Sequence, residues 1–167
     1  MKKIINIKDK RAIEQLKMFK KKKYKDTDVQ FINVHLRLMN EILRTNIFDK
    51  NDLYINATSL WELMQEVGSA GTHNYHGLTE NDIIDALNTI NKPYAVFETM
   101  YNRYVIVSTE LSHFNEQLFV VIELHCSLTN RHDANINKIV TIYPKSDIDK
   151  LLDRMNKELI LYRKNKK

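Results

Sequence analysis

Thr141 and Tyr143 are the first residues in this sequence whose types and spacing suggest chemistry. They lie two positions apart in the stretch Asn-Lys-Ile-Val-Thr-Ile-Tyr-Pro-Lys, residues 137–145, which alternates as a strand does. Alternation places the hydroxyl and the phenol on one face and their aliphatic neighbours on the other, where they can be buried. Pro144 has no N–H to donate and is expected to end the pairing. An edge strand with outward Thr and Tyr explains the same pattern without a function.

A carboxylate and an imidazole are predicted on one face of a neighbouring strand. Glu123 and His125 are two residues apart in the apolar run 118–126. With Thr141 and Tyr143 they form a set suited to proton transfer on a substrate hydroxyl. An ordinary antiparallel sheet with one solvated face also carries such residues, and the sequence leaves both interpretations open.

Two further histidines, His73 and His76, lie in the polar loop 68–77. Loops held by rigid elements often carry function, and an imidazole titrates near neutral pH. All three glycines of the chain fall in this loop, without the spacing of a phosphate-binding motif. Loop histidines are also often plain hydrogen-bonded surface residues, so the sequence does not decide their role.

The composition of the chain limits its class. A length of 167 residues predicts one domain with a peripheral extension. The net charge of +5 permits an anionic partner such as nucleic acid, and Lys20–Lys23 is either a phosphate contact or a solvated connector. There is no apolar run long enough for a membrane span and no secretory signal. The single cysteine, Cys126, fits a reducing, cytoplasmic location.

The hydrophobic periodicity changes from helical to extended along the chain. Helices are expected at 10–24, 28–44, from Ser59 to Gly68, at 79–91 and at 146–156, and strands at 94–99, 104–111, 118–126, 137–143 and 158–163. Capping boxes are expected at Ser59/Glu62 and Thr79/Asp82. This order predicts an α+β fold: N-terminal helices, then a four- to five-stranded antiparallel sheet with flanking helices. Strand parity assigns Val107, Ile122 and Ile142 to one buried face.

An ordered set of short motifs resembles a known family. The set comprises His76-Gly-Leu-Thr-Glu80, a capped helix ending at Pro93, Ala95-Val-Phe97, Val105-Ile-Val-Ser-Thr-Glu-Leu111, Val120-Val-Ile122, Asn137-Lys-Ile-Val-Thr-Ile-Tyr143 and the basic end from Leu161 to Lys166. It resembles the toxin domain at the C-terminus of phage MuF-type head proteins, which is grouped with barnase, EndoU, colicin and RelE-like ribonucleases. The resemblance covers about residues 73–167, and Pro144-Lys145 departs from the family's usual Gly-Lys.

The resemblance implies a toxin domain at 71–167, behind a helical, basic region at 1–70. It implies a metal-independent endoribonuclease of a phage or other mobile element, without a cofactor. His73, His76, Thr141 and Tyr143 would be catalytic, and Asn137 and Lys145 would bind substrate. The expected partners are RNA (tRNA or mRNA) and an acidic antitoxin or immunity protein, with no membrane. A non-catalytic RNA- or DNA-binding module, or a protein-interaction module of a mobile element, stays open as an alternative.

Overall fold

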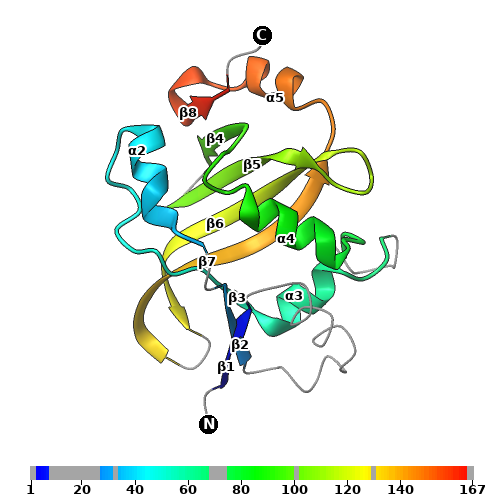
Figure 1. The fold of residues 1–167 in the computed structure, drawn as a ribbon. Coiled ribbons are helices and arrows are strands. Elements are labelled where there is room, and N and C mark those ends of the chain that lie inside the picture. The colour runs from blue at the N-terminus through cyan, green and yellow to red at the C-terminus, as the bar shows by residue number, and fades with distance from the viewer. Residues whose placement is uncertain are drawn as a thin grey trace.

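One mixed β-sheet organises the protein. The computed structural model describes residues 3–7, 27–31, 34–67, 75–99, 102–128 and 131–164. The strands in these ranges are β1 (Lys3–Ile7), β2 (Thr27–Phe31), β3 (Tyr54–Asn56), β4 (Ala95–Glu98), β5 (Arg103–Leu111), β6 (Gln117–Leu128), β7 (Arg131–Lys145) and β8 (Ile160–Arg163). They form one eight-stranded sheet in the order β1-β2-β3-β7-β6-β5-β4-β8 (Figure 1). The pairs β1–β2 and β3–β7 are parallel, and the other neighbouring pairs are antiparallel.

Short helices cover both faces of this sheet. They are the 3-10 helix η2 (Leu36–Leu38), α2 (Met39–Leu43), α3 (Ala57–Leu63), α4 (Glu80–Asn88), α5 (Ile148–Arg154) and the 3-10 helix η3 (Lys157–Leu159). The apolar sides of α2, α3 and α4 pack with one face of the sheet in a larger core. Helix α5 packs on the opposite face in a smaller core with Val107 and Phe119. In Figure 1, α4 lies across the central strands, and α5 lies beside β8 near the C-terminus.

The expected fold of N-terminal helices followed by a four- to five-stranded antiparallel sheet is wrong. Strands β1, β2 and β3 precede the predicted sheet and join it, and they make it mixed. The predicted helix 28–44 begins as strand β2, and only 36–43 is helical. Its apolar spacing is real, because Val29, Leu36 and Met39 are all buried. The spacing is shared between two elements, which a periodicity count cannot separate.

The predicted meander is confirmed, whereas two predictions for the N-terminal region stay untested. The four central strands, β4 to β7, pair antiparallel in chain order, as expected for a meander. The predicted helix 10–24 and Lys20–Lys23 lie outside the described residues. The larger core contains residues from both sides of position 70. The division into 1–70 and 71–167 stays a prediction.

Both faces of the central sheet are buried, and strand parity does not separate them correctly. Val107 pairs with Phe119, whereas Ile122 belongs to the opposite face with Tyr104. Val107, Ile122 and Ile142 are all buried, as predicted, and Ile122 and Ile142 share one face, but Val107 lies on the other. Phe119, on the opposite face of β6 from Ile122, is also only 1% exposed.

Strand β7 contains a β-bulge just before the residues of interest. Val121 pairs with Thr141, but the next residue of β6, Ile122, pairs with Ile139. The extra residue, Val140, breaks the alternation. Ile139 and Ile142 consequently both enter the larger core, although they are three positions apart. Pro144 does not end the strand, because it pairs with Leu118.

The helix caps confirm one of the two predicted capping boxes. Thr79 caps α4: its Oγ1 accepts from Asp82 N at 3.1 Å, and Asp82 Oδ2 accepts from Thr79 N at 2.9 Å. The Ser59/Glu62 prediction is wrong, because α3 begins at Ala57 and Asn56 is its cap. None of the helices in the described ranges has the length and apolarity needed to cross a membrane.

We expect Thr79→Ala to lower the free energy of unfolding by about 1 kcal/mol, because it removes the hydroxyl that caps α4. The matched control is Ser59→Ala, in which a hydroxyl inside α3 is replaced by a strong helix former. This control should leave stability unchanged or raise it by about 0.5 kcal/mol. Urea unfolding followed by circular dichroism measures both values, and equal losses in the two variants would contradict the assignment.

Candidate functional site

Three of the predicted site residues converge. His76 Nε2 lies 3.2 Å from the Thr141 hydroxyl oxygen. The imidazole of His76 also faces the ring of Tyr143, with 5.9 Å between ring centroids. On its other side Tyr143 packs against Phe119, at 5.2 Å between centroids. The prediction that His76 and Tyr143 meet with Thr141 beside them is therefore confirmed, although 65 residues separate His76 from Thr141.

The segment 75–79 brings His76 to this position by passing the edge of β7. Leu78 is buried in the larger core, whereas His76, two residues earlier, contacts Tyr143, which packs against the smaller core. The segment therefore runs from one face of the sheet to the other. Its backbone is held by Gly77 N–H, which donates to Gln65 O at 2.7 Å, and by Leu78 N–H, which donates to Leu63 O at 3.0 Å.

Gly77 is required where the segment turns. Its φ of +64° lies in the left-handed region, which glycine adopts without a steric penalty. A Cβ placed there would lie 3.4 Å from Phe114 Cζ and 3.4 Å from Val67 Cγ2. These are ordinary van der Waals distances, so the positive φ, rather than the space, is what favours glycine at this position.

Asp82 joins the two loops that flank the site. While its Oδ2 accepts from Thr79 N, its Oδ1 accepts from His113 N at 2.9 Å, and the His113 ring nitrogen Nδ1 also contacts Oδ2. Burial acts to raise the pKa of Asp82, but these hydrogen bonds outweigh it and hold the pKa below its usual value. The carboxylate is therefore charged at neutral pH and ties the segment 75–79 to the loop 112–116.

A pocket of about 430 Å³ opens beside the three convergent residues. The side chains that line it are Val67, His76, Phe114, Glu116, Tyr143 and Pro144. Sequence reasoning missed Val67, Phe114 and Glu116. The available signal was an aromatic residue and a carboxylate in the short polar loop 112–117. These two side chains reach the pocket because their loop contacts the segment 75–79, and the spacing of residues in the sequence does not reveal that contact.

Burial changes the proton affinities of both rings. Desolvation lowers the pKa of His76 from its usual value of 6.5, because an apolar surrounding disfavours the charged imidazolium. Desolvation raises the pKa of the Tyr143 phenol above 10 for the corresponding reason. At neutral pH the site therefore contains a neutral imidazole, able to accept a proton, and a protonated phenol, able to donate a hydrogen bond.

The remaining predicted site residues lie elsewhere or outside the description. Asn137 is 2% exposed and donates from Nδ2 to Lys50 O at 2.9 Å, which ties β7 to the loop before β3. It lies four residues from Thr141, roughly 13 Å along a strand. Lys145 is exposed at the end of β7, opposite Gln117. His73 lies outside the described residues. The substrate-binding roles of Asn137 and Lys145 stay predictions.

Glu123 and His125 do not act together on one strand face. Arg103 Nε donates to Glu123 Oε1 at 3.2 Å, while His125 Nδ1 lies 3.0 Å from Asn135 Oδ1. His125 has a φ of +59°, within a register shift between Glu123 and Cys126. The regular alternation that would place both side chains on one face is absent at this point.

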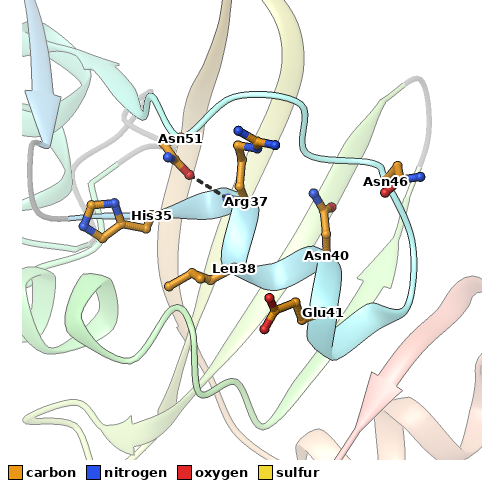
Figure 2. Close-up of a pocket in the computed structure, with 7 residues that line it drawn as sticks. All are labelled: His35, Arg37, Leu38, Asn40, Glu41, Asn46 and Asn51. Atoms are coloured by element: carbon orange, nitrogen blue, oxygen red, sulfur yellow. Dashed lines mark hydrogen bonds between the residues drawn. The ribbon is translucent and has the colours of Figure 1, made fainter.

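A different pocket, with mostly polar side chains, lies on the surface formed by η2, α2 and the loop that follows them (Figure 2). It is lined by His35, Arg37, Leu38, Asn40, Glu41, Asn46 and Asn51. Arg37 N–H donates to Asn51 Oδ1 at 3.0 Å, and the Asn40 amide bonds both the N–H and the C=O of Phe48. These bonds hold the loop in place and explain Asn40 and Asn51 structurally. Within the described ranges, no three His, Cys, Asp or Glu side chains are grouped as metal ligands.

Comparison with known families identifies the chain. The model of the phage MuF C-terminal domain matches residues 69–167, more than half of the sequence. The chain belongs to this family. The match begins just after Val67 and includes the other five pocket residues. The predicted MuF-type resemblance is confirmed at this level, while membership of the ribonuclease toxin group stays a prediction. No curated protein and no solved structure matches significantly.

We expect the imidazole of His76 in this MuF C-terminal domain to titrate below pH 6.5, because burial disfavours its charged form. Protonation then favours the unfolded chain, so His76 reduces stability as the pH falls through 6.5 towards its folded pKa. NMR titration of the ring carbon shifts measures the midpoint, and the same histidine in urea-unfolded protein is the reference. A folded midpoint at or above the unfolded one would contradict the burial argument.

Proposed function

We propose that this protein is a metal-independent endoribonuclease that acts as a toxin of a phage or other mobile element. The observation that carries the proposal is the convergence of His76, Thr141 and Tyr143 at one pocket. RNA transesterification without a metal needs a base, an acid and donors that stabilise the phosphorane charge, and an imidazole, a hydroxyl and a phenol can fill these roles. Membership of the phage MuF C-terminal domain family supports the mobile-element origin.

The reaction uses the 2′-hydroxyl of RNA as its nucleophile. A base removes the 2′-hydroxyl proton while the 2′-oxygen attacks the adjacent phosphorus. The bond between phosphorus and the 5′-oxygen then breaks, and that oxygen takes up a proton. The products are a 2′,3′-cyclic phosphate and a free 5′-hydroxyl, so atoms and charge balance without a cofactor. Hydrogen-bond donors stabilise the extra negative charge on the phosphorane.

His76 is assigned as the base. Its lowered pKa keeps the ring neutral at pH 7, which a proton acceptor requires. The Thr141 hydroxyl, 3.2 Å from Nε2, orients the ring. Tyr143 keeps its proton through its raised pKa and donates to a non-bridging phosphate oxygen or to the leaving oxygen. Lys145 is exposed two residues further along β7, and its positive charge would attract the RNA backbone towards this end of the strand.

Glu116 offers a different assignment of the same residues. As a carboxylate lining the pocket it can accept the 2′-hydroxyl proton, and protonated His76 would then be the acid. The lowered pKa of His76 argues against this order, because little imidazolium remains at neutral pH. RNA of the host cell is the proposed substrate, which requires action in the cytoplasm. A basic protein of this kind is suited to an acidic immunity partner.

We expect His76→Ala and Tyr143→Phe each to reduce kcat/KM for RNA cleavage by about 100-fold or more, the usual contribution of one acid–base or charge-stabilising group. The assay is cleavage of a fluorescent oligoribonucleotide in the presence of a chelator. Leu38→Ala, an exposed side chain in the other pocket, is the control and should cleave normally. Thermal unfolding should show all three variants folded. Cleavage by folded His76→Ala at the wild-type rate would refute the proposal.

The dependence of kcat/KM on pH distinguishes the two assignments. With His76 as base, activity rises with pH through a midpoint below 6.5, remains level, and falls only above pH 10, where Tyr143 ionises. Tyr143→Phe should remove the alkaline fall from the residual activity. With Glu116 as base and His76 as acid, activity would instead decline as the pH rises through a midpoint below 6.5. That profile would make His76 the acid and Glu116 the base.

A further inference from the structure

We propose that the pocket beside His76 binds one unpaired nucleobase of the substrate, stacked on Phe114, so that the enzyme acts on single-stranded RNA. The inference rests on the proposed function and names the substrate class of the same site. Phe114 is 42% exposed and Val67 is 66% exposed, and both line this pocket. Large apolar side chains at the surface beside a reactive site indicate a ligand that covers them.

Phe114 is held ready as a stacking surface. One side of its ring packs against the His113 imidazole, with 3.8 Å between centroids. His113 is in turn fixed by Asp82 through its backbone N–H and its ring. The ring therefore loses little side-chain freedom on binding a ligand, which favours affinity.

The shape and chemistry of the pocket suit a base. Its walls combine the rings of Phe114 and Tyr143 with the flat side of Pro144, and about 430 Å³ is enough for a purine or a pyrimidine. Stacking on aromatic rings accepts any base, because each has a π-face. His76 and Tyr143 line the same pocket, so a bound base places its own ribose next to the proposed chemistry. A base inside a duplex is already paired and stacked and would first have to be flipped out, which favours single-stranded RNA.

The test measures binding separately from cleavage. The probe is a three-unit RNA analogue with 2′-O-methyl groups, which cannot be cleaved, carrying one adenine between two abasic units. A second probe is abasic at all three positions. Dissociation constants for wild type, Phe114→Leu, Phe114→Trp and the control Leu38→Ala are measured by NMR titration at one salt concentration.

We expect Phe114→Leu to weaken binding of the adenine probe by about 5-fold to 150-fold, the range for loss of one stacked base. Phe114→Trp should bind it at least as well as wild type, and Leu38→Ala should bind it equally. Binding of the abasic probe should be the same in all four proteins. The proposal would be overturned if Phe114→Leu weakened binding of both probes equally or of neither. The exposed side chains of Phe114 and Val67 would then be assigned to contact with a protein partner.

The result is independent of whether the protein cleaves RNA. Stacking without any cleavage would refute the nuclease assignment and keep the base-binding pocket. If cleavage depends on His76 but base binding is unaffected by Phe114→Leu, the nuclease assignment is kept and the base-binding pocket is refuted. The spectra of each variant also report whether it is folded, and Phe114→Trp keeps the aromatic ring even where Phe114→Leu disturbs the loop.

Discussion

The carboxylate of Asp82 is the contact on which the arrangement of the site depends. One oxygen accepts from Thr79 N–H and fixes the start of α4, and the other accepts from His113 N–H in a loop 31 residues away. The side chain of Asp82 is 5% exposed, and its Oδ2 also contacts the ring nitrogen Nδ1 of His113. Because both loops line the pocket, this buried carboxylate holds the segment of His76 and the loop of Phe114 together.

The sheet determines where chemistry can occur in this molecule. Both faces of its central strands are covered, by α4 on one side and α5 on the other, so the faces are core. Functional side chains must then gather at an edge. Strand β3 pairs with β7 at one position, Tyr54 with Lys138, and the segment 75–79 runs past the part of β7 beyond it. The end of β7 that carries Thr141 and Tyr143 is consequently where the segment 75–79 and the loop 112–116 meet the sheet.

Some short motifs in this chain predict the structure correctly, whereas the capping box at Ser59 and the strand stop at Pro144 do not. The Thr79/Asp82 capping box and the meeting of His76 with Tyr143 follow from short motifs and from where a helix must begin. Parity misassigns the faces of the strands, since register depends on pairing across the sheet and Val140 adds a bulge. The sequence of β2 predicts a helix, because Val29 continues the helical spacing of the apolar residues in η2 and α2 and also fits the alternation of a strand. The loop that carries Phe114 and Glu116 is tied to the site by Asp82, a contact without a sequence signature.

The bulge at Val140 has a consequence for how this site can change. In an uninterrupted strand, Ile139 and Ile142 would point to opposite sides, and one of them would compete with the polar residues for the rim. The additional residue lets both isoleucines fill one core while Thr141 and Tyr143 stay beside His76. The position of the hydroxyl and the phenol thus depends on the number of residues between Ile139 and Ile142. Substitutions in this stretch would change the chemistry of the site, whereas deletion of one residue would move Thr141 and Tyr143 away from His76.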